Sequence, residues 1–139
     1  MLDFLCKESY DLRDFLALIT FLRSPDGCPW DRAQTHTSLK PYCIEEAAEV
    51  IGGINIWEAT GDAENLKEEL GDLMLQILLH AQIAEEEGLF TIREVMDGAS
   101  EKMIRRHPHV FGKSMLSEQG EPVTDWDAIK KQEKAGKEW

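Results

Sequence analysis

The segment from Leu70 to Ala84 constrains the fold of this chain more strongly than any other part of the sequence. It carries alanines and a run of larger apolar residues that leaves almost no polar face on a helix: Leu70, Leu73, Met74, Leu75, Ile77, Leu78, Leu79 and Ile83. A helix that is apolar all round must be covered on several sides. A chain of 139 residues can hardly supply that cover by itself. We therefore expect an oligomer in which helices pack across the interface.

Composition limits the remaining possibilities. The 139 residues, of which 42% are hydrophobic, suit one domain over residues 1–139 with a substantial apolar core. The stretch from Leu73 to Ala84 is free of charge but has only 12 residues. Because a helix needs ~20 residues to cross a bilayer, we expect no membrane span. The net charge of −12 argues against a surface that binds nucleic acid.

The cysteines and the first residues indicate a cytoplasmic protein. No basic and then apolar leader opens the sequence, so we do not expect secretion. Cys6, Cys28 and Cys43 form an odd set without a CxxC motif, which is typical of free thiols in a reducing cytoplasm. We expect no zinc site at Cys28, His36 and Cys43, because their spacing is not that of zinc ligands.

The periodicity of apolar residues predicts an all-α chain of about four to five helices, with no convincing strand. The expected helices cover residues 12–22, 38–59, 63–87, 89–105 and 125–137, and the expected loops cover 25–37 and 112–122. Ser38 is the expected N-cap of the second helix. The pair Gly52-Gly53 should weaken that helix, because each glycine costs up to ~1 kcal/mol relative to alanine.

Two pairs of acidic residues are placed to face each other. Glu46 and Glu49 are three residues apart, so both project from one side of the second helix, and Glu69 and Asp72 do the same on the third. Glu49 and Glu69 are equidistant from residue 59. So are Glu46 and Asp72, and an antiparallel hairpin that turns there brings all four carboxylates level.

Four anions beside an apolar seam repel one another and are costly to desolvate. Hard divalent cations take oxygen ligands, and Mg²⁺ binds a few carboxylates while keeping water or phosphate in its other positions. The pattern therefore predicts a Mg²⁺ site, and the alternative is an ordinary set of acids on a helix surface. Glu45 points about 100° away from Glu46 around the helix. Its role stays open between a base, a further ligand and a solvated side chain.

A metal beside carboxylates implies an anionic substrate, which the acidic protein would otherwise repel. The segment from Lys102 to Lys113 contains four basic residues, two histidines and no acid. We expect Mg²⁺ to neutralise part of the phosphate charge and this basic segment to hold the rest.

Four blocks, in order, resemble the MazG family of nucleoside triphosphate pyrophosphohydrolases. They are CPWD at 28–31 with QTH at 34–36 and SL at 38–39, EEAAE at 45–49 with ELGD at 69–72, KMIRRHPHVFG at 102–112, and the weaker pair of Trp126 and Lys130. Together they cover roughly residues 10–135. A lone EExxE motif is weak evidence, whereas four blocks in order are highly specific.

The resemblance implies an all-α helical bundle that dimerises through intertwined helices, with a site in each four-helix-bundle-like core. It implies Mg²⁺-dependent cleavage of a nucleoside triphosphate between the α and β phosphates, with Mn²⁺ as a substitute metal. By motif position the metal ligands are Glu46, Glu49, Glu69 and Asp72. The residues expected to bind substrate are Lys102 and Arg106 at the phosphates and Trp126 and Lys130 closing over it.

The expected reaction is attack by a metal-bound water at phosphorus, with Lys102, Arg106 and Lys130 stabilising the pyrophosphate leaving group. Glu45 or a ligand carboxylate would accept the proton of that water. Trp30 could stack on a nucleobase, although a packing anchor is the more common role for a tryptophan in such a loop. His80 is expected to be buried and bonded to the backbone.

The alternatives are a specialised relative that cleaves dUTP, dCTP or phosphoribosyl-ATP, and a catalytically idle helical module that binds nucleotide or another protein. The intact acidic quartet (Glu46, Glu49, Glu69 and Asp72) and the basic block count against the idle module. The preferred base and sugar, and the choice between nucleotide-pool cleansing and control of signalling nucleotides, stay open.

Overall fold

The computed structural model describes residues 5–112, 115–116, 122–123 and 126–137. Its elements are α1 (Leu12–Leu22), α2 (Pro29–Arg32), α3 (His36–Thr60), α4 (Glu64–Glu86), α5 (Ile92–Arg106), α6 (Pro108–Phe111), β1 (Met115–Leu116), β2 (Pro122–Val123) and α7 (Trp126–Lys134). The expectation of an all-α fold is confirmed. The chain forms two compact units, Met1–Ile92 and Arg93–Trp139.

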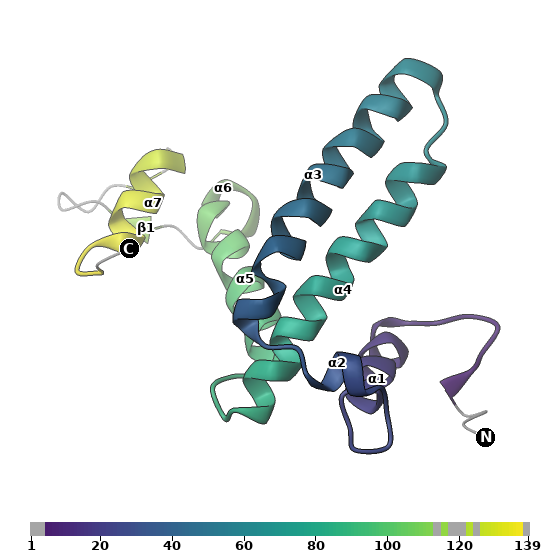
Figure 1. Cartoon of the computed structure of the whole chain (residues 1–139). Helices are drawn as coiled ribbons and strands as arrows, with labels where there is room; N and C mark the ends of the chain where they lie inside the picture. The colour runs from purple at the N-terminus through teal and green to yellow at the C-terminus, as the bar shows by residue number, and fades with distance from the viewer. Residues whose placement is uncertain (1–4, 113–114, 117–121, 124–125, 138–139) are drawn as a thin grey trace. The chain divides into compact units, whose positions relative to one another are not determined.

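The first unit is built around a long antiparallel hairpin of α3 and α4 (Figure 1). The hairpin turns at Gly61, whose φ of 78° lies in the left-handed region that glycine adopts readily. The N–H of Gly61 donates to the carbonyl of Trp57 at 2.7 Å and so ends α3. The turn therefore lies close to residue 59, the position from which the paired acidic residues are equidistant.

The start of α3 differs from the expectation by one turn. Thr35, not Ser38, is the N-cap. The Ser38 N–H donates to Thr35 Oγ1 at 3.0 Å, and the Thr35 N–H donates to Ser38 Oγ at 2.8 Å. This reciprocal capping box satisfies two backbone donors at once, which explains why the helix begins at His36.

Gly53 allows α3 and α4 to pack closely, although glycine has a low helix propensity. It is buried, and a Cβ atom at this position would lie 2.8 Å from Leu66 Cα on α4. The two helix backbones can approach this closely only because Gly53 has no side chain. The expectation that Gly52-Gly53 merely weakens α3 was therefore incomplete, because at Gly53 the close packing offsets the cost in propensity.

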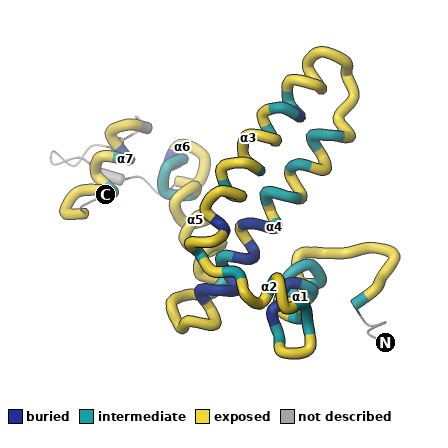
Figure 2. Tube along the Cα trace, viewed as in Figure 1, coloured by how far each residue is buried: buried dark blue, intermediate teal, exposed yellow. Residues whose placement is uncertain are grey.

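The core of the first unit lies at the end of the hairpin away from the turn, where α1 packs against α4 (Figure 2). Its buried residues are Ile19, Leu39, Leu78, Leu79 and Ile83. Arg23, only 8% exposed, ties this region together. Its guanidinium donates to both carboxylate oxygens of Glu86 and to the carbonyls of Asp31 and Gln34 at 2.6–3.1 Å.

Two expected loops contain short regular elements. The loop expected over 25–37 contains the single-turn helix α2, with Pro29 at its first position. The loop expected over 112–122 contributes the antiparallel pairing of β1 with β2, two residues on each side. Such short elements leave almost no periodic signal in a sequence.

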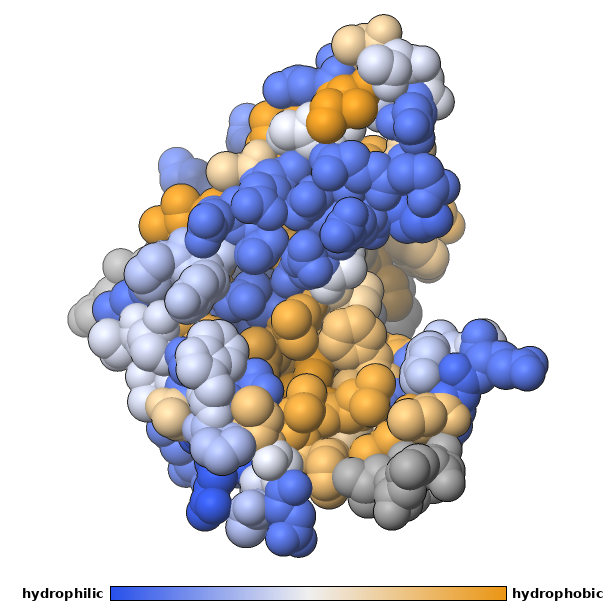
Figure 3. Space-filling view, turned by 45° about the vertical axis from the view of Figure 1, so that its right-hand side comes forward, coloured by the Kyte–Doolittle hydropathy of each residue, from blue (hydrophilic) through white to orange (hydrophobic). Residues whose placement is uncertain are grey.

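The apolar circumference of α4 is only partly covered within the chain. Leu70, Met74 and Ile77 follow one another along the helix and are 49%, 45% and 50% exposed. On the face that Figure 3 presents, apolar side chains gather in one continuous patch beneath a band of hydrophilic residues. Among the described residues, no helix combines the length and apolar character needed to cross a membrane.

Candidate functional site

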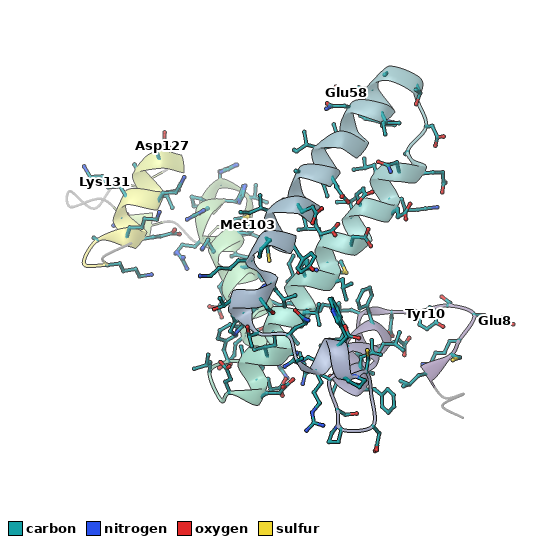
Figure 4. All side chains as sticks on the ribbon, viewed as in Figure 1. Glu8, Tyr10, Glu58, Met103, Asp127 and Lys131 are labelled. Atoms are coloured by element: carbon teal, nitrogen blue, oxygen red, sulfur yellow. The ribbon has the colours of Figure 1, made fainter. Side chains whose placement is uncertain are left out.

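The hairpin brings the acidic quartet together at mid-length. Glu46 and Glu49 come from α3, and Glu69 and Asp72 from α4. One carboxylate oxygen of each residue lies within 4.8 Å of those of the other three. Figure 4 shows side chains of both helices meeting across the seam of the hairpin. The first and last of these residues, Glu46 and Asp72, are 26 residues apart in the sequence, yet all four form one cluster. This follows because each pair across the hairpin is equally far from the turn.

The cluster is anionic and short of hydrogen-bond donors. Glu46, Glu69 and Asp72 are half-buried, and Glu49 is exposed. Within the described part of the chain, Glu46 Oε2 and Glu69 Oε2 are buried and accept no hydrogen bond. Asn65 Nδ2 approaches Glu69 Oε1 at 3.4 Å, which is a weak contact. A buried anionic oxygen without a donor is costly, and a bound cation would remove that cost.

The proton affinities of two carboxyls reflect this crowding. A hydrogen bond with Glu49, together with burial and the charges of Glu49, Asp72 and Glu46, raises the pKa of Glu69 to about 7. Burial, followed by the charges of Glu49 and Asp72, raises the pKa of Glu46 above its ordinary range. Carboxyls that are close together and partly shielded from water resist ionising together.

An all-oxygen ligand set of this kind suits hard divalent cations such as Mg²⁺, Mn²⁺ or Ca²⁺. The two unsatisfied buried oxygens show that the residues fit such an ion. A cation held only by side chains on one hairpin keeps free positions for water or for phosphate oxygens.

Three other expected site residues of the first unit have different surroundings. Glu45 is exposed and does not belong to the group of oxygens within 4.8 Å. Trp30 lies on α2 with 58% of its surface exposed, so within the single chain it is not buried as a packing anchor. His80 was expected to bond to the backbone, but its ring nitrogens contact the side chains of His36 and Cys43.

The basic residues expected to bind substrate belong to the second unit. Lys102 on α5 is exposed, and Lys130 on α7 is half-buried. Arg106 is committed to an ion pair: its Nη2 lies 2.8 Å from Glu133 Oε2, and both side chains are nearly buried, 11% and 7% exposed. Arg105 Nε lies 2.7 Å from the other oxygen, Glu133 Oε1. The side chain of Trp126 lies outside the described residues.

Glu133 is the residue that the sequence analysis missed. Burial works to raise the pKa of Glu133, but hydrogen bonds from Arg106 and Arg105 outweigh it, so the pKa lies below its usual range. The run of basic residues from Lys102 to Lys113 predicts a phosphate-binding surface and gives no sign of an internal ion pair. An acid 27 residues away, in a short polar helix, carried no spacing signal that would have linked it to Arg106.

Comparisons with known proteins point to one family. A family model described as the MazG nucleotide pyrophosphohydrolase domain matches residues 34–111. The chain is 52% identical over 124 residues to the Thermotoga maritima nucleoside triphosphate pyrophosphohydrolase/pyrophosphatase MazG, covering 89% of this chain and 46% of the relative. It is 42% identical over 123 residues to the Escherichia coli nucleoside triphosphate pyrophosphohydrolase, covering 88% and 45%.

A third relative is the uncharacterized Bacillus subtilis protein YabN, 49% identical over 125 residues, covering 90% of this chain and 25% of the relative. The chain therefore spans less than half the length of each of these three relatives.

The pKa of Glu69 yields a prediction about stability in the absence of metal. The folded state holds a proton on Glu69 up to about pH 7, whereas an ordinary glutamate loses it near 4.5. Between these values the folded state binds more protons, so this residue's contribution to the free energy of unfolding falls as the pH rises. Glu69→Gln should therefore become progressively more stable relative to wild type from pH 4.5 to 7, as measured by urea unfolding in a chelator.

The control is Glu58→Gln, an exposed acid near the turn end of α3 that is labelled in Figure 4. The difference in stability between Glu58→Gln and wild type is the reference with which the Glu69→Gln difference is compared at each pH. A constant difference between Glu69→Gln and wild type would contradict the prediction.

Proposed function

Because the chain belongs to the MazG nucleotide pyrophosphohydrolase family, we propose that it hydrolyses nucleoside triphosphates between the α and β phosphates, releasing the monophosphate and pyrophosphate. The observation that carries this proposal is the acidic quartet, with its two unsatisfied buried oxygens. Relatives named nucleoside triphosphate pyrophosphohydrolase support it. Cleansing of the nucleotide pool is the role we propose for this activity.

We infer that Glu46, Glu49, Glu69 and Asp72 hold Mg²⁺, for which Mn²⁺ is a substitute. When bound, such an ion polarises phosphoryl oxygens and lowers the pKa of a coordinated water. The chain's own contribution is to hold four carboxylates on two packed helices, with Gly53 and Gly61 setting the register. The exposed Glu45, next to Glu46 in the sequence, is a candidate to accept a proton from the attacking water.

We propose that Lys102, Arg106 and Lys130 bind the phosphates and stabilise the pyrophosphate as it leaves. Lys102 supports this best, because its ammonium group is on an exposed side chain. The support for Arg106 is weaker, because its guanidinium is already paired with Glu133. Trp30 and Trp126 are the aromatic residues proposed to contact the rest of the nucleotide, and the exposed indole of Trp30 is compatible with stacking on a base.

Asp72→Asn tests the metal site, because it keeps the side-chain volume and removes one charge and one strong ligand. We expect turnover of a panel of ribo- and deoxyribonucleoside triphosphates, including dUTP and dCTP, to fall by about a hundredfold or more. Without metal the variant should be no less stable than wild type, because repulsion within the quartet decreases. Its melting temperature should rise less on addition of Mg²⁺.

Release of pyrophosphate rather than orthophosphate identifies the bond that is cleaved. Glu58→Gln serves as the matched control and should retain turnover and the full Mg²⁺ response. Normal activity in Asp72→Asn would end the metal hypothesis for this residue. A wild-type protein that gains stability with Mg²⁺ but cleaves no nucleotide in the panel would indicate an idle binding module.

The second unit offers a matched pair of arginines. Arg106→Ala and Arg105→Ala each remove one guanidinium from Glu133, so both should lower the melting temperature. Only Arg106→Ala should also lower kcat/KM by about tenfold or more, because a charge-assisted phosphate contact contributes about 1.5–3 kcal/mol. Steady-state kinetics and thermal unfolding of both variants separate the two roles. Equal losses of activity in both would assign Arg106 to structure alone.

We also propose that the protein is a homodimer or a larger homo-oligomer, because the stripe of Leu70, Met74 and Ile77 lies exposed in the single chain. Sedimentation velocity at micromolar concentration should give at least twice the 15.8 kDa mass of the chain. Met74→Lys should shift the distribution toward the monomer, since it places a charge in the apolar stripe. A stable 15.8 kDa species for the wild type would contradict the intertwined architecture.

A further inference from the structure

A second cluster of reactive side chains lies on the same hairpin, outside the acidic quartet. Cys43 Sγ on α3 lies 3.1 Å from His80 Nε2 on α4. The other ring nitrogen of His80, Nδ1, lies 2.7 Å from Nδ1 of His36, the first residue of α3. The two rings are nearly parallel, with an interplanar angle of 5°. The sulfur and the His36 ring therefore contact opposite nitrogens of one imidazole.

This arrangement determines which atoms can carry protons. Two nitrogens at 2.7 Å share a single proton, so one Nδ1 donates and the other accepts. When His80 Nδ1 donates to His36, His80 Nε2 presents its lone pair to Cys43 and accepts the hydrogen bond of the thiol. His36 then carries its own proton on Nε2, which lies 3.9 Å from the carboxylate of Glu87. Cys43, His80 and His36 therefore contact one another in the order nucleophile, base and orienting group, which is the pattern that activates a thiol.

The surroundings favour this state. Cys43, His80 and His36 are half-buried, so they are partly shielded from water but not sealed. Burial, followed by the neighbouring His36, lowers the pKa of His80, which leaves its ring neutral and able to accept a proton at pH 7. Among the described residues, Cys43 is the cysteine whose sulfur contacts an imidazole.

We propose that Cys43 is a nucleophilic thiol and a modification site for low-molecular-weight disulfides, with His80 as its base and His36 as the residue that orients His80. The thiol proton passes to His80 Nε2, and the thiolate attacks one sulfur of the disulfide. A new sulfur–sulfur bond forms at Cys43 while the original one breaks. The departing thiolate leaves with the electron pair of that bond and takes up a proton, so Cys43 is oxidised and the other half of the reagent is reduced.

This chemistry uses none of the groups of the acidic quartet. The two sites are nevertheless adjacent along α3, since Cys43 precedes Glu46 by three residues and projects from the same side of the helix. A group attached to Cys43 would therefore lie one turn from the quartet.

Single-thiol chains test the proposal. Cys6→Ser/Cys28→Ser leaves Cys43, and Cys6→Ser/Cys43→Ser leaves Cys28, which is also half-buried and serves as the matched control. The probe is dithiodipyridine, an uncharged disulfide that the acidic protein does not repel. At pH 7 a free thiol is only a few per cent thiolate, so we expect Cys43 to release thiopyridone about tenfold or more faster than Cys28.

His80→Gln in the chain that retains only Cys43 should reduce this rate about tenfold, and circular dichroism checks that the variant is folded. Cys43 reacting no faster than Cys28 would overturn the proposal even if His80→Gln does not fold, since both single-thiol chains keep His80. A fast Cys43 whose rate is unchanged by His80→Gln would overturn the assignment of His80 as the base.

Discussion

The backbones of α3 and α4 touch at Gly53, and this contact governs which other side chains of the hairpin can meet. A Cβ there would lie 2.8 Å from Leu66 Cα, so any other residue would push the two helices apart or slide one along the other. With the turn at Gly61 as a second fixed point, the register of the hairpin is set over its whole length. The acidic quartet and the contact of Cys43 with His80 both depend on that register.

Two features made parts of the fold predictable: the local periodicity of apolar residues, and the number of residues that separate each acidic residue from the hairpin turn. The bounds of α1, the end of α3 and the span of α4 follow from apolar spacing and from Gly61 and Gly88. The meeting of Glu46 with Asp72 follows as well, because in a single hairpin sequence distance from the turn converts directly into position. The roles proposed for these residues in catalysis remain predictions.

The contacts that could not be predicted are those whose partners cannot be found by counting residues from a single turn. Arg106 and Glu133 are 27 residues apart with several short elements between them, and His36 and His80 are 44 residues apart. The spacing of Cys28, His36 and Cys43 is not that of zinc ligands, and nothing in the sequence links His36 or Cys43 to His80. Side-chain rotamers, which spacing does not reveal, decide that His80 lies between the other two.

Each unit of the chain contains both buried apolar residues and an ion pair. The first combines its apolar core with the pair of Arg23 and Glu86, and the second combines the buried Ile129 with one carboxylate, Glu133, shared by two guanidiniums of α5. Apolar packing responds weakly to pH and to salt, but an ion pair is lost when its acid is protonated. Acidification should therefore remove the ion pair of each unit and leave the apolar contacts in place. One change in pH would then weaken the two units at separate places.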